Sequence, residues 1–176
     1  MPKTAKNKSE KSLKNEDFSE LYESILDRVL AKARKGGAYI TDLVDEVGDD
    51  FHALEELGKD KAALLKSYVK RDLLDAGNYL NTSGNTLRDW LGFDMALIES
   101  KLWLNFSEAA DQTTLELIKL REQATLQTYH TGESIGIGTL QCDECDALLH
   151  FHRPSKIPPC AKCHHTSFHR ASASSQ

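Results

Sequence analysis

The sequence has only four cysteines and four prolines among its 176 residues, and aromatic residues make up 7%. It has no apolar run close to the eighteen or so residues that a membrane-spanning helix needs. Its first residues also lack the charged, apolar and cleavage regions of a secretory signal peptide. We therefore expect a cytoplasmic protein, in which paired cysteines are more often metal ligands than disulfides.

Positive charge is scarce where a nucleic-acid-binding domain would need it. The net charge is −5 overall, but it is +4 over residues 1–14, −9 over residues 15–128 and zero over residues 129–176. The acidic middle would repel a phosphate backbone. The lysine-rich start is predicted to be a disordered basic tail over residues 1–16, with contact to RNA or to an acidic surface as the alternative.

The four cysteines form two pairs, Cys142-x-x-Cys145 and Cys160-x-x-Cys163, with fourteen residues between the pairs. A two-residue spacer lets one tight turn direct two thiolates at the same ion, and two such turns complete a tetrahedral site. Four sulfur ligands leave no position for water, so the pattern predicts a structural ion. We expect Zn²⁺, with iron as the alternative occupant. Two disulfides are disfavoured by the expected compartment, and a redox-active pair by the lack of a βαβ pattern.

The sequence around the cysteines is typical of a small β zinc ribbon over residues 129–170. Strands are predicted over 135–140 and 147–152, with a short third strand over 167–169. About forty residues cannot bury enough apolar surface to fold alone, so the metal is expected to stabilise the segment.

Turn chemistry and histidines add detail to this ribbon. Asp146 and His164 follow the second cysteine of each pair, where a positive φ is often required, and both residue types tolerate it. Histidines beside a tetrathiolate centre are expected to donate hydrogen bonds to sulfur rather than to form a second metal site. The ribbon histidines are His130, His150, His152, His164, His165 and His169.

Residues 17–128 have the spacing of amphipathic helices. In the last segment, over 91–124, apolar residues recur every three or four positions for more than thirty residues. That pattern predicts one long fourth helix in an antiparallel bundle or a coiled coil. The expected fold is therefore mainly α, with a helical domain over 17–128, a zinc ribbon and a disordered tail over 171–176.

The chain resembles the YbeL-like zinc-ribbon proteins of gamma-proteobacteria. The motifs that carry the resemblance are 129–133 (YHTGE), 135–138 (IGIG), Leu140 and the cysteine pairs, with 70–73 (KRDL) and 98–103 (IESKLW) upstream. The resemblance implies a cytoplasmic, non-enzymatic zinc protein whose four cysteines are the ligands. It supplies no catalytic residue, and His164 stands where that family commonly has glycine.

Three functions are compatible with these features. The first is a protein-interaction or adaptor module that presents Arg153, Ser155 and Lys156 to a protein partner. The second is a nucleic-acid- or transcription-associated ribbon with a basic and aromatic face. That face would comprise Phe151, His152, Arg153, Lys162, His165, Phe168, His169 and Arg170. The third is an electron carrier with iron at the cysteines.

Overall fold

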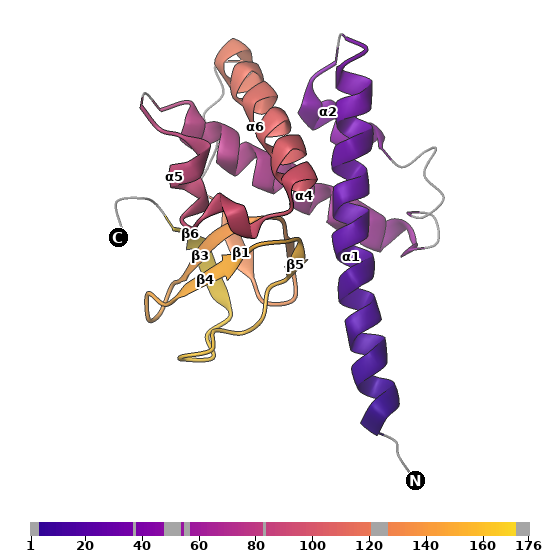
Figure 1. Ribbon diagram of the computed structural model, residues 1–176, viewed down its shortest axis with the longest axis vertical. Helices are drawn as coiled ribbons and strands as arrows, with labels where there is room; N and C mark the ends of the chain where they lie inside the picture. The colour runs from indigo at the N-terminus through magenta and orange to yellow at the C-terminus, as the bar shows by residue number, and fades with distance from the viewer. Residues whose placement is uncertain are drawn as a thin grey trace.

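The computed structural model describes residues 4–36, 38–47, 54, 57–82, 84–120 and 127–171. Helices occupy most of the first two thirds, and strands occupy the last (Figure 1). The helices are α1 (Thr4–Ala33), α2 (Ile40–Glu46), α4 (Lys59–Leu80), α5 (Leu87–Leu91), the short 3-10 helix η1 (Met95–Leu97) and α6 (Ser100–Leu120). None of these helices is long and apolar enough to cross a membrane.

The helices share one apolar core. Helix α4 contacts α1, α2, α5 and α6, and in the view of Figure 1 it runs across α1 and α6. Its closest neighbour is α6, because Gly77 has no side chain where the methyl group of Thr113 approaches. The largest side chains fully buried in this core are Tyr22, Ile25, Leu26, Leu30, Ile40, Leu54, Leu65, Leu73, Leu91 and Phe106.

The long fourth helix predicted over 91–124 is wrong. Gly92 has a φ of 76° and ends α5 in the left-handed conformation, and Ile98 is extended between η1 and α6. The side chain of Asp94 accepts a hydrogen bond from the Ala96 N–H and so begins η1. The apolar periodicity continues through these breaks, which is why the pattern alone suggested a single helix. The antiparallel bundle and the coiled coil remain predictions.

The N-terminal segment also differs from expectation. Helix α1 begins at Thr4, so the backbone of residues 4–16 is helical although we predicted a disordered tail there. The segment contains neither glycine nor proline, and its lysines and glutamates favour a helix. Most of the predicted C-terminal tail, residues 172–176, lies outside the described residues.

The cysteine-containing segment forms two small antiparallel sheets. A four-stranded sheet has the order β1-β6-β3-β4, and a two-stranded sheet pairs β2 with β5. The strands are β1 (Thr128–His130), β2 (Ser134–Ile135), β3 (Gly138–Cys142), β4 (Leu148–Phe151), β5 (Ser155–Lys156) and β6 (Ser167–Arg170). The strands predicted over 147–152 and 167–169 are present as β4 and β6. The single strand predicted over 135–140 is divided, because β2 ends at Ile135 and β3 begins at Gly138, and β1 and β5 were not predicted.

The ribbon has its own small core and lies against the helices. That core consists of Tyr129, Ile135, Leu140, Phe151, Ile157 and Phe168 together with the cysteines. Strand β2 contacts α4, β3 contacts α5 and β5 contacts α1. At one of these contacts the buried hydroxyl of Thr139 donates to the Leu91 carbonyl oxygen at 2.7 Å. The two parts of the chain are thus in direct contact.

Candidate metal centre and ribbon docking site

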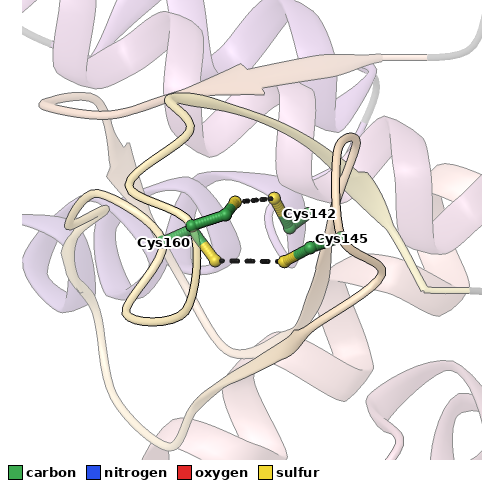
Figure 2. Close-up of side chains that lie close together, drawn as sticks. Cys142, Cys145 and Cys160 are labelled. Atoms are coloured by element: carbon green, nitrogen blue, oxygen red, sulfur yellow. Dashed lines mark hydrogen bonds between the residues drawn. The ribbon is translucent and has the colours of Figure 1, made fainter.

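The four predicted ligands lie together at one end of the ribbon. Cys142 ends β3 and Cys145 lies in the turn between β3 and β4, while Cys160 and Cys163 come from the turn before β6. Figure 2 shows Cys142, Cys145 and Cys160 pointing toward one another. All four Sγ atoms lie within 4.8 Å of one another. The Sγ–Sγ distance is 3.5 Å for Cys142 and Cys163 and 3.6 Å for Cys145 and Cys160, so neither pair is a disulfide.

The cluster fits a tetrahedral metal ion. Four sulfurs at about 2.3 Å from a zinc ion would be about 3.8 Å apart, close to the distances observed. The thiolates needed as ligands are favoured unequally. The backbone N–H groups of Cys163 and Lys162 lower the pKa of the Cys160 thiol to about 6. The pKa of Cys163 is raised to about 12, because burial and the three neighbouring sulfurs outweigh the His165 N–H. A bound metal cation would offset the negative charge of four neighbouring thiolates.

Each cysteine pair sits in the turn that its spacing requires. Asp146 has a φ of 56° and His164 a φ of 60°, as the sequence predicted. The Asp146 N–H donates to the Cys142 carbonyl at 3.1 Å, and the His164 N–H donates to the Cys160 carbonyl at 2.9 Å. His164 thus adopts the left-handed conformation that glycine adopts easily, and the turn is kept.

Three of the six ribbon histidines have partners other than sulfur, contrary to our prediction for them. Among the described side chains, His150 Nδ1 lies 2.9 Å from the Thr139 hydroxyl, and His169 Nδ1 lies 2.6 Å from an Asp143 carboxylate oxygen. His130 Nδ1 is 3.4 Å from Glu133. These contacts stabilise strand pairs and turns, since each joins residues that are already neighbours across the sheet or along the chain.

The basic and aromatic face predicted for nucleic acid lacks its aromatic residues and one of its cations. Phe151 and Phe168 are buried in the ribbon core and cannot stack on bases. Arg170 points into the molecule, where its guanidinium group lies over the Trp90 ring at 4.5 Å. His169 is paired with Asp143.

A buried carboxylate that the sequence did not single out joins the ribbon to the helices. Asp72 on α4 is fully buried. Its Oδ2 accepts hydrogen bonds from the Tyr22 hydroxyl at 2.8 Å and the Gly136 N–H at 2.6 Å, and its Oδ1 accepts one from Arg170 at 3.2 Å. Burial and the Asp72 charge raise the pKa of Tyr22 well above its ordinary value, so this hydroxyl remains a donor.

Two arginines complete this docking network. Arg71 on α4 reaches Glu133 at 2.5 Å and the Ser134 carbonyl at 2.8 Å, and its guanidinium group lies 3.9 Å from the centre of the Tyr129 ring. Arg170 on β6 donates to the Ile137 carbonyl and the Tyr129 hydroxyl. Because a buried charge is tolerated only when it is paired and hydrogen-bonded, the network fixes how the ribbon sits on α4. The docking network is defined here as Tyr22, Arg71, Asp72, Asp75, Tyr129, Glu133 and Arg170.

Asp75 gives this network an excess negative charge. Three carboxylates (Asp72, Asp75 and Glu133) face two guanidinium groups, and Asp75 accepts a hydrogen bond from the Tyr129 hydroxyl. Burial raises the pKa of Asp75 to about 7, with Asp72 adding to the rise and Arg170 opposing it. Near neutral pH this carboxyl therefore takes up a proton that it would not hold in the unfolded chain.

We expect the protein to gain stability from Asp75 as the pH falls from 8 to 5. The folded pKa of about 7 exceeds the unfolded value of about 3.9. The contribution is thus present at low pH and is lost as the pH rises through 7. Asp75→Asn should stabilise the protein at pH 8 by about 1–3 kcal/mol and much less at pH 5.

Urea unfolding of the wild type and of Asp75→Asn at a series of pH values checks this prediction. The titration of the cysteines affects both proteins equally, so it cancels in the difference between their unfolding free energies. Asp111→Asn, an exposed change on α6, should give a small difference that does not vary with pH. The account of Asp75 is wrong if its own difference is also constant.

Gly136 is predicted to resist substitution for steric reasons. A Cβ at this position would lie 2.6 Å from Cζ of Tyr22 and 3.1 Å from Oδ2 of Asp72. Gly136→Ala should cost about 1–3 kcal/mol in unfolding free energy, measured in urea. In a Tyr22→Ala background the same change should cost clearly less, since the obstructing ring is gone. An equal cost in both backgrounds would show that Tyr22 is not the obstruction.

Comparison with known proteins agrees with the cysteine cluster. Residues 27–172 match the family model described as "Zinc-ribbon containing domain" (DUF1451). Relatives named "Uncharacterized protein YbeL" occur in Escherichia coli strains K12, O6:H1 and O157:H7. Each is 26% identical over 153 residues, which is 86% of this chain and 94% of the relative. No solved structure matches the chain.

The matched region contains both cysteine pairs, the six ribbon strands and α4 with its docking residues. The family resemblance predicted from the ribbon motifs is confirmed over most of the chain. The chain belongs to the DUF1451 family of proteins with a zinc-ribbon domain.

Proposed function

We propose that this chain is a non-enzymatic, cytoplasmic protein-interaction module in which a structural zinc ion shapes a ribbon surface for a protein partner. The observation that carries the proposal is that the ribbon is held at both ends. Four sulfurs gather its two turns at one end, and Arg170 and Asp72 fix the other end to the helices at 3.2 Å. A ribbon held at both ends is a rigid surface that depends on the metal.

The metal's part in this proposal is structural. Cys142, Cys145, Cys160 and Cys163 would hold the ion and complete its tetrahedral coordination. When bound, zinc supplies the cross-link that a segment of about forty residues needs in order to stay folded. Iron is the alternative occupant, since four thiolates accept either metal.

The loop residues expected to meet a partner remain accessible. Arg153 and Lys156 are exposed, and Ser155 is partly exposed. Their backbone is ordered by the β2–β5 pairing, and the Lys156 ammonium group lies 4.6 Å from the centre of the Phe18 ring. The loop is thus tied to α1, and its shape depends on ribbon and helices together.

The alternative of a nucleic-acid- or transcription-associated ribbon has less support. Its aromatic residues are buried, and one of its expected cations is used inside the protein. The acidic charge of residues 15–128 also opposes phosphate contact. Binding to single-stranded and duplex DNA and RNA, measured at several salt concentrations, distinguishes the two functions. Affinity that falls steeply with salt would favour this alternative.

The proposed function is tested by affinity capture with cross-linking from the native cell. The wild type is compared with Cys142→Ser/Cys160→Ser, which disables the metal site, and with Lys162→Ala, an exposed change in the second cysteine turn. We expect partners captured by the wild type and by Lys162→Ala to be lost with the double serine variant. The proposal fails if no partner is reproducible, or if every partner stays bound to the double serine variant.

A further inference from the structure

A cleft lies where the ribbon meets the helices. Its volume is about 610 Å³, within the range of sites that bind small molecules or short peptides. Glu23 on α1 and Glu99 before α6 line the helical side, and His150 and Arg153 line the ribbon side. The cleft therefore exists only while the ribbon is docked.

One side of this cleft is the free edge of a sheet. In the described part of the chain, β4 stands last in its sheet and pairs only with β3. Alternate residues of an edge strand direct their N–H and C=O groups away from the sheet, where an extended segment can pair with them. His150 and Phe151 of β4, and His152 just after it, line the cleft. A segment paired with β4 would therefore run beside the cleft.

The helical side of the cleft has two carboxylates, Glu23 and Glu99, that form no ion pair among the described residues. Among the described residues, Glu23 receives one long hydrogen bond, from the Ser19 hydroxyl at 3.4 Å. The nearby cation Lys101 is paired with Asp27 at 2.7 Å. Burial, followed by the charge of Glu99, raises the pKa of Glu23, so a cation placed here would be stabilised.

The remaining lining favours an apolar neighbour beside that cation. Leu97 is 57% exposed at the cleft, and Leu102 and Phe151 form apolar surface deeper in it. The rings of His150 and His152 both pack against the Phe93 ring. Their centroids lie 5.7 Å and 4.6 Å from the Phe93 centroid, and these contacts hold this part of the ribbon in place. Arg153 on the opposite side can pair with a carbonyl or carboxylate group of the ligand.

We infer that this cleft binds an extended segment of a partner protein that pairs with β4 and places an arginine or lysine between Glu23 and Glu99, with an apolar side chain on Leu97. The inference rests on the proposed interaction function and gives the partner's chemistry. It also explains why that function would depend on a folded ribbon, since β4 and its histidines form one side of the site.

The test uses a blocked pentapeptide, threonine–valine–arginine–valine–threonine, added to the full zinc-loaded chain and followed by amide NMR. We expect shifts at residues 148–152 and near Glu23. Replacing the central arginine with glutamine, or using the Glu23→Gln/Glu99→Gln variant, should weaken binding about tenfold, as expected for one partly buried charge pair. N-methylation of the peptide backbone should abolish the shifts, and Asp111→Asn should leave them unchanged.

The inference is overturned if no shift occurs at residues 148–152 at millimolar peptide, or if the arginine and glutamine peptides bind equally. Amide spectra of Glu23→Gln/Glu99→Gln and of Asp111→Asn without peptide should match the wild-type spectrum, which shows that both variants remain folded. If capture finds partners that still bind Glu23→Gln/Glu99→Gln as tightly as the wild type, the cleft is not their site, although the interaction function stands. If capture finds no partner while the peptide binds as described, the proposed function fails and the cleft remains a peptide site.

Discussion

Removal of the metal is expected to unfold the ribbon and to leave most of the helical core folded. Chelation should broaden or collapse the amide NMR signals of residues 127–171, while signals from the core of α4 and α6 remain dispersed. The ribbon core is small, so the folded ribbon depends on the free energy of metal binding. Structural zinc supplies roughly 10–16 kcal/mol in isolated peptides. Among the described residues, the helical core forms its own cluster and includes only Ile137 from this segment.

Without a chelator, Cys142→Ser/Cys160→Ser should give the same amide spectrum as the chelated wild type. Added zinc should restore the original spectrum of the chelated wild type but not that of the variant. Helical signals next to the ribbon, at Tyr22 and Asp72, should shift in both cases because their partners Gly136 and Arg170 have moved. A metal-free protein with unchanged signals at residues 127–171 would show that docking alone keeps the ribbon folded.

Loss of the Asp72 carboxylate should have the second large effect. Asp72→Ala leaves the Tyr22 and Gly136 donors without their acceptor in a buried site, and it removes one of the two carboxylates that pair with the Arg170 guanidinium group. Breaking one partner of a buried ion pair costs about 3–5 kcal/mol. We therefore expect the urea midpoint to fall strongly and the ribbon amides to exchange faster with solvent.

Asp72→Asn keeps an oxygen that can accept from Gly136 but removes the charge, and it should fall between the wild type and Asp72→Ala. Asp111→Asn, on an exposed face of α6, should change the unfolding free energy by less than about 0.5 kcal/mol. If Asp72→Ala also stays within that limit, the docking network does not hold the ribbon to the helices.

The local features of the ribbon could be predicted from the sequence because they depend on close neighbours. The spacing of the cysteine pairs requires two tight turns, and Asp146 and His164 adopt the predicted positive φ. Strands β3, β4 and β6 follow from alternating apolar residues between turn residues. Strands of two or three residues, such as β5 and β1, carry no such signal.

The docking network could not be predicted because its members are distant in the sequence. Asp72 and Arg170 are separated by 98 positions, and Tyr22 and Asp72 by 50. An aspartate in a charged helical segment has the pattern of a solvent-exposed residue, and the sequence around Arg170 predicts part of a basic surface. The packing of the ribbon against α1 and α4 brings them together.

The long-helix prediction failed for a different reason. The apolar residues that keep helical spacing across these breaks lie in or against the same core; they are Leu91, Met95, Ile98, Leu102 and Phe106. The break is encoded by Gly92 at the end of α5 and by the Asp94 side chain that begins η1. Both signals are short, and a periodicity measured over thirty residues outweighs them.

Metal analysis with X-ray absorption on protein purified without added metal tests whether the four cysteines hold a structural zinc ion. A structural zinc site predicts one zinc ion per chain with four sulfur neighbours at about 2.3 Å and no visible absorption band. It is contradicted by oxygen or nitrogen in the first coordination sphere, by a metal-free protein with disulfides that remains folded, or by iron with its visible spectrum.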